Sequence, residues 1–552
     1  MSKYIFISGG VISGIGKGIA AASIGLILKS YGKKITMIKA DPYLNMDAGT
    51  MNPLEHGETF VLEDGFETDM DMGTYERFVN ESFSRKNSMT GGAVLSEVLR
   101  GERALEYDGK WISLDHHVPV AMVNWMEEVS KQTKSDITIV EIGGTVGEMG
   151  NALFLEANRM LKFTRPSDVI HIHVAYFPIP ENLGEMKSKP AQLSIQELDS
   201  HSVHPDFVLA RAKVLVDDVR IEKLEKYSII KHGNVIPAPD EDCIYDIPVN
   251  FDCFDIGEKI LRSLNLRGKR NTTLDKWKKK ASKIRRLKKN INIGIVGKYY
   301  KSGDFDLKDS YVSVLEAIKH AGWELGANPV INWFVSDDLL DNKDEQKRLK
   351  SMDGIIVPQG WGSRGSEGKI EAIRIARENK IPYLGLCYGM QMAVIEFARN
   401  VLGIKDASSE EVNPKSKDLV IHLMDAQKKN IKEKNYGGTI RLGAYPCKVK
   451  PKTTLYSLYE KYANELYSCL PVVMERHRHR YEFNNEYRDA FEKGGLILAG
   501  SSPDNSLIEA VELPKKMHPF FVATQYHPEL KSRFLLPHPL FMGFVDACLK
   551  KK

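Results

Sequence analysis

Short β-rich runs alternate with helical patterns along nearly the whole chain. In the first half such runs cover residues 4–8, 35–39, 136–141, 168–175 and 206–210. In the second half they cover residues 291–296, 329–335, 354–357 and 521–525, with a helical pattern over 311–325. Strands that alternate with helices form mostly parallel sheets covered by helices on both faces. We therefore expect an α/β protein made of two doubly wound domains.

The length of 552 residues exceeds what a single hydrophobic core supports. Lys and Arg dominate residues 267–290, where apolar residues recur at helical spacing. We expect a first domain over 1–266, a second over 291–552, and a basic helical connector over 267–290 with its charges in solvent. A nucleic-acid-binding patch is the alternative for the connector.

Composition excludes several classes of protein. The 77 Lys and Arg residues nearly balance the 73 Asp and Glu residues, which gives a net charge of +4 and no sign of a bulk polyanion partner. The longest nearly apolar stretch, residues 19–28, is too short to cross a bilayer. The six cysteines are scattered, as expected for reduced thiols. We expect a cytoplasmic enzyme with no nucleic-acid or membrane partner.

A cysteine stands at a predicted strand–turn–helix junction in the second half. Gly385 and Gly389 flank Cys387 at two-residue spacing, which permits a tight turn that presents the sulfur above a sheet. A helix that begins at the cysteine favours its thiolate form. This pattern predicts a nucleophile, and a small buried hydrophobic residue is the alternative.

A base and its partner follow in Thr524-Gln-Tyr-His527-Pro-Glu529. Side chains two apart in an extended segment project to the same side, so an imidazole and a carboxylate can lie in line. A thiol nucleophile needs both. The glycine-rich residues 358–365 after the run at 354–357 could supply an oxyanion hole. The alternatives are a surface histidine and an ordinary turn.

Residues 8–19 follow the first predicted strand and open a helix, as in a phosphate-binding loop in which Lys17 faces the phosphates. The usual pattern fails at Val11 and at Gly18, which replaces the hydroxyl residue that binds Mg²⁺. Carboxylates elsewhere must then hold the metal, and Asp71 and Glu141 are the candidates. A glycine-rich turn without a ligand and ordinary surface acids are the alternatives.

The motifs of the second half resemble a class I glutamine amidotransferase domain over residues 291–552. The resemblance implies that Cys387, His527 and Glu529 form a catalytic triad that releases ammonia from glutamine. It also implies a set of glutamine contacts: Gly360, Tyr388, Gly389, Met390, Gln391, Glu411 and Arg480. Arg480 ends the cluster Arg476-His-Arg-His-Arg480, for which a solvated charged face is the alternative.

The first half resembles the synthetase domain of the CTP synthase family. The matching segments are Gly9-Gly-Val-Ile-Ser13-Gly-Ile-Gly-Lys-Gly18, Lys39-Ala-Asp41-Pro-Tyr, Glu63-Asp-Gly65, Asp71-Met-Gly-Thr-Tyr75-Glu-Arg77, Glu141-Ile-Gly-Gly-Thr-Val-Gly147 and Lys187-Ser-Lys-Pro-Ala-Gln192. The family's reaction phosphorylates O4 of UTP with ATP, and ammonia then displaces phosphate to give CTP.

The same resemblance implies the nucleotide sites. ATP would contact Gly14, Ile15, Gly16, Lys17, Gly18, Ile19, Lys39, Asp71 and Asp240. UTP or CTP would contact Ser13, Glu148, Met149, Gly150, Lys187, Ser188, Lys189, Pro190, Ala191, Gln192 and Lys223, and Mg²⁺ would bind Asp71 and Glu141. Three residues depart from the family pattern: Gln359, Gly150 and Pro239.

The family further implies activation by GTP near residues 363–368, feedback by CTP, homotetramers that stack into filaments, and a sheltered path for ammonia. Two alternatives remain open for the chain as a whole. One is a different ATP-dependent amidoligase that uses glutamine, against which the segments 187–192 and 71–77 speak. The other is a non-catalytic filament-forming homologue.

Overall fold

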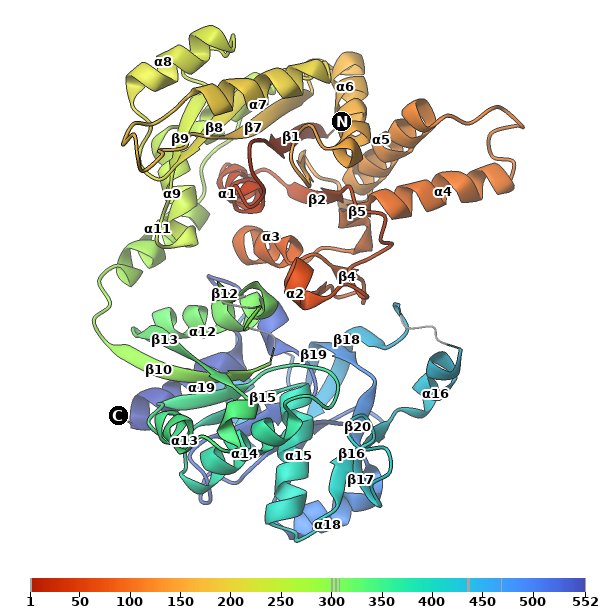
Figure 1. Cartoon of the computed structure of the whole chain (residues 1–552), viewed down its shortest axis with the longest axis vertical. Coiled ribbons are helices and arrows are strands. Elements are labelled where there is room, and N and C mark those ends of the chain that lie inside the picture. Colours follow the sequence, from red (N-terminus) through yellow and green to blue (C-terminus); the bar gives the residue numbers. More distant parts are fainter. Residues whose placement is uncertain are drawn as a thin grey trace. The chain divides into compact units, whose positions relative to one another are not determined.

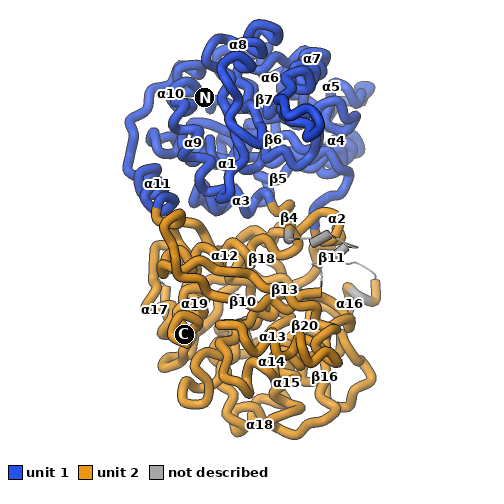
Figure 2. Tube along the Cα trace, turned by 60° about the vertical axis from the view of Figure 1, so that its left-hand side comes forward, with its two compact units in different colours: residues 1–48, 71–282 blue, residues 49–70, 283–552 orange. Residues whose placement is uncertain are grey.

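The structure, a computed structural model, describes residues 2–298, 301–302, 305–306, 308–433, 437–467 and 469–551. The chain forms two compact units (Figures 1 and 2). The first unit comprises Met1–Ala48 and Asp71–Ser282, and the second comprises Gly49–Met70 and Lys283–Lys552. Both are α/β, as the alternating pattern predicted.

A seven-stranded sheet forms the centre of the first unit, in the order β5-β2-β6-β1-β7-β8-β9, with every neighbouring pair parallel. The strands are β1 (Lys3–Gly9), β2 (Ile35–Asp41), β5 (Ser88–Thr90), β6 (Ile137–Ile142), β7 (Val169–Tyr176), β8 (Phe207–Ala212) and β9 (Val235–Pro239). The five inner strands are the five that the sequence predicted. The two edge strands were missed.

Helices cover both faces of this sheet (Figure 1). They are α1 (Lys17–Ser30), α3 (Asp71–Val79), α4 (Gly91–Arg103), α5 (Leu114–Thr133), α6 (Ala152–Thr164), α7 (Lys189–Ser200), α8 (Asp218–Tyr227), α9 (Ile247–Cys253), α10 (Ile256–Ser263) and α11 (Thr273–Ile284). On β6, Val140 faces the core formed with α4, α5 and α6, whereas Ile139 lies next to α1. Alternate residues of one buried strand thus serve two cores.

Helix α11 lies in the basic stretch expected to be a connector. Its Leu274, Trp277 and Ala281 are buried, and Trp277 donates a hydrogen bond to the carbonyl of Tyr245 at 2.8 Å. Lys276 and Lys279 on the same helix are exposed. The apolar positions at helical spacing therefore fasten this helix to the first unit, and much of its charge faces solvent, as predicted.

The second unit has a nine-stranded sheet in the order β13-β10-β14-β15-β23-β22-β21-β18-β19. Its strands are β10 (Asn290–Gly297), β13 (Asn328–Val335), β14 (Gly354–Val357), β15 (Tyr383–Leu386), β18 (Arg441–Val449), β19 (Val472–His479), β21 (Ile497–Ser501), β22 (Ile508–Glu512) and β23 (Phe521–Thr524). The first five strands in that order are parallel, and the remaining pairings are antiparallel. The antiparallel half was not foreseen.

Two hydrophobic cores lie in the second unit, one on each side of its central strands. The helices are α12 (Val312–Glu324), α13 (Lys343–Lys350), α14 (Ser366–Glu378), α15 (Tyr388–Asn400), α16 (Asp425–Lys432), α17 (Thr454–Lys461), α18 (Arg488–Lys493) and α19 (Pro539–Lys551). Short strands complete the unit: β11 (Lys301–Ser302), β12 (Phe305–Asp306), β16 (Ala407–Ser409), β17 (Asp418–Leu423) and β20 (Tyr481–Phe483).

Residues 49–70 belong to the second unit although the first unit surrounds them in sequence. They form α2 (Pro53–His56), β3 (Phe60–Val61) and β4 (Glu67–Thr68). Glu63 pairs with Arg476 at 2.9 Å, and Glu67 pairs with Arg478 at 2.8 Å. Arg476 is fully buried, so its partner compensates an otherwise costly charge. The charged run 476–480 is thus not a solvated face.

Among the residues that the structure describes, none of the helices combines the length and the apolar character needed to span a lipid bilayer.

Candidate active sites

The loop between β1 and α1 has a conformation suited to binding an anion. Gly14 and Gly16 have φ values of 69° and 91°. Val11 has φ 81°, which is strained for a β-branched residue and costs about 1–3 kcal/mol. Val11 therefore stands in a glycine conformation at the position where the phosphate-loop pattern calls for glycine. Lys17 opens α1 and donates a hydrogen bond to the carbonyl of Gly144 at 2.7 Å.

Lys39, near the end of β2, lies close to three carboxylates at the carboxyl edge of the sheet. Its ammonium group donates to Asp71 and lies 3.2 Å from Oε1 of Glu141 and 3.6 Å from Oδ1 of Asp41. Tyr75 donates a hydrogen bond to the other oxygen of Glu141. The structure thus brings the two predicted metal ligands together, around one cationic atom.

Burial and the neighbouring lysines together set the pKa values of the carboxylates in this cluster. Burial raises the pKa of Glu141, and Lys39 only partly offsets it. Burial also disfavours charge on Asp71, but Lys39 and then Lys17 hold the pKa of Asp71 below its usual value. Hard carboxylate oxygens that already surround a cation are the donor set that Mg²⁺ prefers. The cluster therefore fits a divalent ion that shares these carboxylates with Lys39.

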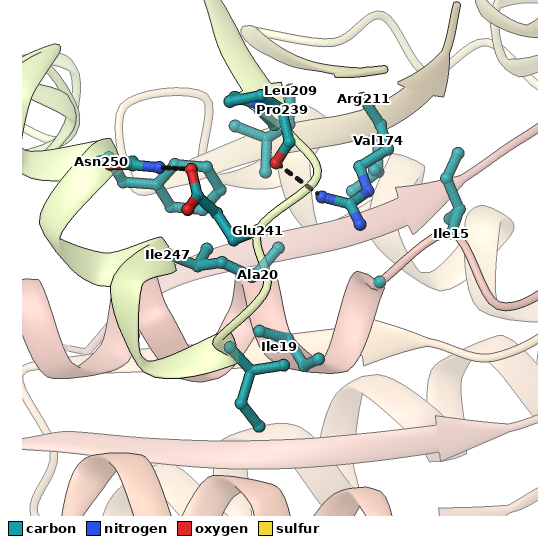
Figure 3. Close-up of a pocket in the computed structure, with 14 residues that line it drawn as sticks. Ile15, Ile19, Ala20, Val174, Leu209, Arg211, Pro239, Glu241, Ile247 and Asn250 are labelled. Carbon is teal, nitrogen blue, oxygen red and sulfur yellow. Dashed lines mark hydrogen bonds between the residues drawn. The ribbon is translucent and has the colours of Figure 1, made fainter. Parts of the chain in front are cut away.

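A narrow, mainly apolar pocket of about 70 Å³ adjoins the loop (Figure 3). Ile15, Gly16 and Ile19 line it from the loop and α1, and Pro239 lines it from the end of β9. Arg211 donates to the carbonyl of Pro239 at 2.9 Å and pairs with Asp240 at 2.9 Å. The pocket is therefore an apolar space next to a loop suited to binding an anion.

Residues 187–192 span the start of α7, with Ser188 at its N-cap and Gln192 donating to Ser188 Oγ at 3.3 Å. Lys187 pairs with Glu185 at 2.5 Å, and Lys223 on α8 also interacts with Glu185 electrostatically. The predicted pyrimidine-site residues of these two segments therefore share one neighbourhood.

The segment 148–150 is more open. Met149 is 93% exposed, and Glu148 accepts a hydrogen bond from the backbone N–H of Thr145 at 2.9 Å. A Cβ at Gly150 would lie 3.0 Å from Pro42, so a larger residue there would press on the turn after β2. The side chain of Met149 therefore has few contacts within the protein.

Cys387 occupies a strained elbow in the second unit. It has φ 52° and ψ −100° at the N-cap of α15, between the central strand β15 and the helix. A Cβ at Gly389 would lie 2.0 Å from the carbonyl oxygen of Val357, and one at Gly385 would lie 2.6 Å from the Tyr383 hydroxyl. Both flanking glycines are therefore required by close approach, and they let the sulfur stand at the end of the parallel strands.

His527 lies beside Cys387 and is held by Glu529, whose Oε1 is 2.7 Å from Nδ1 of His527. Burial disfavours the charged imidazole, but Glu529 and Cys387 raise the pKa of His527 to about 10. The segment is not extended as expected. Residues Pro528–Lys531 form a short 3₁₀ helix, which brings the glutamate back to the histidine.

Two lysines that the sequence analysis did not predict donate hydrogen bonds to backbone carbonyls of the loop after β14. Lys369 is fully buried and donates to the carbonyl of Pro358 at 3.0 Å. Lys298 donates to the carbonyls of Trp361, Gly362 and Arg364. Both ammonium groups lie over the ring of Tyr388, whose hydroxyl also binds the Gly362 carbonyl at 2.7 Å. Lysines carry no motif, so only the structure reveals this role.

Several predicted glutamine-site residues converge near this loop. Glu411 accepts a hydrogen bond from Gly362 N–H at 2.7 Å and interacts electrostatically with Arg480. Gln391 donates to the Tyr481 carbonyl at 3.1 Å, and its buried Oε1 has no hydrogen-bond partner among the described residues. Met390, by contrast, packs its side chain into the core, so only its backbone is available to a ligand.

His477, His479 and Glu509 form a buried group with metal-ligand chemistry. Arg441 already occupies it: its guanidinium lies 2.7 Å from Glu509 and 3.4 Å from one ring nitrogen of each histidine. Burial keeps the pKa of both histidines well below the usual value. The arrangement is a charge-compensated support for β19 rather than a metal site.

Comparison with known proteins shows the family to which the chain belongs. The family described as CTP synthase N-terminus matches residues 3–266, and the family described as glutamine amidotransferase class-I matches residues 306–547. A CTP synthase of Halalkalibacterium halodurans is 44% identical over 552 residues, which is 100% of both chains. The chain belongs to the CTP synthase family. A CTP synthase of Sulfurisphaera tokodaii is 46% identical over 548 residues, covering 99% of each chain, and one of Caldanaerobacter subterraneus is 45% identical over 553 residues, covering 100% and 99%.

Two of the three departures from the CTP synthase pattern have clear structural settings. Pro239 lines the pocket, and its carbonyl accepts a hydrogen bond from Arg211. Gln359 lies in the loop beside Cys387 and donates a hydrogen bond to Glu58 at 3.2 Å. Glu58 belongs to residues 49–70. Nothing in the sequence indicated that this segment would contact the loop after β14.

Proposed function

We propose that the chain makes CTP from UTP, ATP and glutamine, releasing ADP, phosphate and glutamate. The observation that carries this proposal is the pairing of a Cys387–His527–Glu529 group in one unit with a phosphate loop and a Lys39–carboxylate cluster in the other. A nucleotide-activating site and an ammonia-releasing site together are what an amination by glutamine needs. The full-length relatives are CTP synthases, which supports UTP as the acceptor.

In the glutaminase step, Cys387 attacks the carboxamide carbon of glutamine as a thiolate. His527, charged at neutral pH because its pKa is about 10, gives its proton to the departing nitrogen. Ammonia leaves, a glutamyl thioester remains, and water activated by the now neutral imidazole hydrolyses it to glutamate. Glu529 keeps the imidazole oriented throughout, and backbone N–H groups near Gly360 face the oxyanion.

Substrate glutamine would be held at its α-carbon end. Glu411 would receive the α-ammonium and Arg480 the α-carboxylate, because the two charges lie close enough to interact. The unpartnered Oε1 of Gln391 is a further acceptor in this region. Tyr388, Gly389 and Met390 would contribute through backbone and shape.

In the synthetase step, the uracil O4 must be phosphorylated before it can leave. The loop Gly14–Ile19 and Lys17 would bind the ATP phosphates, and the pocket of Figure 3 would take the adenine beside Pro239 and Asp240. Asp71 and Glu141 would hold Mg²⁺, which neutralises charge on the transferring phosphoryl group. Lys39 would stay next to that group as a fixed positive charge.

UTP would bind through its phosphates and base to Ser13, Lys187 to Gln192, and Lys223. Two lysines near Glu185 can exchange that partner for a triphosphate, which offers more charge. The exposed segment 148–150 would become covered when UTP or CTP binds. We further propose GTP activation near residues 363–368, a homotetramer able to form filaments, and a cytoplasmic location, all by analogy with the family.

The test follows CTP formation from UTP and MgATP with either glutamine or ammonium as nitrogen donor. Cys387→Ala should abolish the glutamine-dependent rate and keep the ammonium-dependent one. Lys17→Ala should abolish both. Cys447→Ala is a matched control because that buried thiol lies in the hydrophobic core. Formation of another aminated product in place of CTP would indicate a different amidoligase, and loss of both rates in the wild type would indicate a non-catalytic homologue.

A further inference from the structure

Gln525 lies beside the nucleophile elbow, at the end of the neighbouring strand. Strand β23 pairs in parallel with β15, so Gln525 follows one strand as Cys387 follows the other. Its backbone N–H donates to the carbonyl of Glu509 at 2.8 Å, and its side chain is fully buried. The amide Nε2 donates a hydrogen bond to Sγ of Cys387 at 3.5 Å. The side chain of Gln525 therefore contacts the reacting atom itself.

A series of contacts determines which end of this amide faces the sulfur. The nitrogen and the oxygen of an amide are nearly alike in shape, so their hydrogen-bond partners distinguish them. Gln391 must direct its Nε2 at the Tyr481 carbonyl, 3.1 Å away, because a carbonyl accepts and cannot donate. The same Nε2 donates to Oε1 of Gln525 at 3.4 Å. With its oxygen turned to Gln391, Gln525 presents its N–H group to Cys387.

The sulfur also has an acceptor close to it. The backbone carbonyl of Arg478 lies 3.7 Å from Sγ of Cys387. A thiol can donate to that oxygen, whereas a thiolate is repelled by it. A hydrogen bond to a charged group favours its charged form, so the N–H group of Gln525 offsets the effect of this carbonyl.

The charge on His527 makes an ionised sulfur necessary. Burial disfavours the charged imidazole, but Glu529 and Cys387 raise the pKa of His527 to about 10. A charged imidazole has no lone pair with which to take a thiol proton. Cys387 must therefore be a thiolate before it attacks glutamine, and a group that stabilises this thiolate contributes to the rate of attack.

We propose that Gln525 is a further catalytic residue of the glutaminase step, which holds Cys387 as a thiolate through its Nε2–H group. The inference rests on the proposed function and adds a fourth side chain to the triad. When the thiolate attacks, an S–C bond forms and the carbonyl electron pair moves to oxygen. When water later hydrolyses the thioester, the S–C bond breaks and the sulfur leaves as a thiolate. The N–H group of Gln525 is in place to bind the thiolate before the first step and after the second.

The test measures how fast iodoacetamide alkylates Cys387 in the full-length protein without glutamine. Mass spectrometry of the modified peptides separates Cys387 from the exposed Cys253 and Cys469. In Gln525→Leu, which keeps the bulk but loses the donor, alkylation at pH 7 should be about fivefold slower or more. Raising the pH should close this gap, because the sulfur then ionises without the donor. Glutamate release should fall with alkylation, and CTP formation from ammonium should be unchanged.

Two further variants separate the hydrogen bond from packing. Gln525→Met has the chain length of glutamine and no donor, so it should show the same loss and replaces Gln525→Leu if that protein fails to fold. Gln346→Leu removes an amide on α13 that donates to the Leu339 carbonyl at 2.8 Å. This control should leave both alkylation and glutamate release unchanged.

Two outcomes would overturn the inference. If the Gln525 variants are alkylated at the wild-type rate at pH 7, the amide does not stabilise the thiolate. If alkylation falls by the same factor at every pH, Gln525 only shapes access to the elbow. Failure of the proposed function looks different: the wild-type protein would then release no glutamate from glutamine, while alkylation would still distinguish the variants from it.

Discussion

Gly18 leaves the space that Asp71 occupies. A Cβ at position 18 would lie 2.4 Å from Oδ1 of Asp71 and 2.9 Å from its carboxyl carbon. The hydroxyl residue that usually follows the phosphate-loop lysine is therefore replaced by a carboxylate that arrives from α3. The absence of a side chain at Gly18 is what allows the carboxylate of Asp71 to lie beside the loop.

This relationship predicts the effect of Gly18→Ser. The new Cβ must push Asp71 away from Lys39, and we expect CTP formation with either donor to fall about tenfold or more, at the 1–3 kcal/mol typical of overpacking. Glutamate release should persist. Gly25→Ala on the same helix is the control, because its Cβ would meet only apolar side-chain atoms, at 3.1 Å or more, and no part of the carboxylate cluster. A Gly18→Ser enzyme with normal Mg²⁺ dependence would contradict this account.

The pKa of His527 predicts how glutaminase activity depends on pH. Its value of about 10 lies above the usual 6.5, so the stability that the charged imidazole contributes is complete below pH 6.5 and is lost as pH rises through 10. Because the charged imidazole is the proton donor to the leaving nitrogen, glutamate release should decline only as the pH approaches 10. Glu529→Gln removes the principal charge partner, so we expect the decline to move to lower pH and the rate to drop roughly a hundredfold. An unmoved alkaline limb in a pH–rate profile would argue against this pairing.

Lys369 predicts a conflict between stability and activity. Burial holds its pKa well below the usual 10.5, so the unfolded chain binds this proton more readily and the lysine makes folding less favourable at neutral pH than at high pH. Lys369→Met should raise the free energy of unfolding by about 1 kcal/mol or more at pH 7. Because it frees the Pro358 carbonyl, it should also reduce glutamate release. Thermal unfolding and glutaminase assays of one sample measure both effects, and Lys380→Met on the exposed surface is the control.

Arg441 predicts a large structural penalty. Arg441→Met would leave Glu509 buried without its cation, at a cost of about 3–5 kcal/mol. Adding Glu509→Gln should recover much of that loss, because the unpaired charge is then gone. Urea unfolding of the single and double variants checks this. Equal destabilisation in both would mean that the two side chains do not act as a pair.

Sequence patterns predicted the interior of each sheet better than its borders. The inner strands of the first unit are continuous apolar runs, which parallel sheets require. Strand β9 contains Pro237 and Pro239, a pattern that predicts a loop. An edge strand tolerates proline because one side of it needs no hydrogen bonds. Strand β5 is only three residues long and gives no periodic signal.

At the candidate sites, motifs predicted a nucleophile, its base, a phosphate loop and acidic metal ligands, and these roles stay predictions. They could not show Lys298, Lys369 or Glu58, because a lone lysine or glutamate in a sequence looks like any surface charge. Nor could they show that Glu529 reaches His527 through a 3₁₀ turn. Such contacts depend on tertiary packing between distant segments.

The place of residues 49–70 has a consequence for how the protein is made. Glu63 and Glu67 leave the ribosome long before Arg476 and Arg478, which follow them by 413 and 411 residues. Residues 49–70 therefore remain without these partners until nearly the whole polypeptide has been synthesised. A gene split between residues 282 and 283 would encode a second product that lacks the partners of its own buried arginines. We expect this connectivity to keep the two activities on one polypeptide.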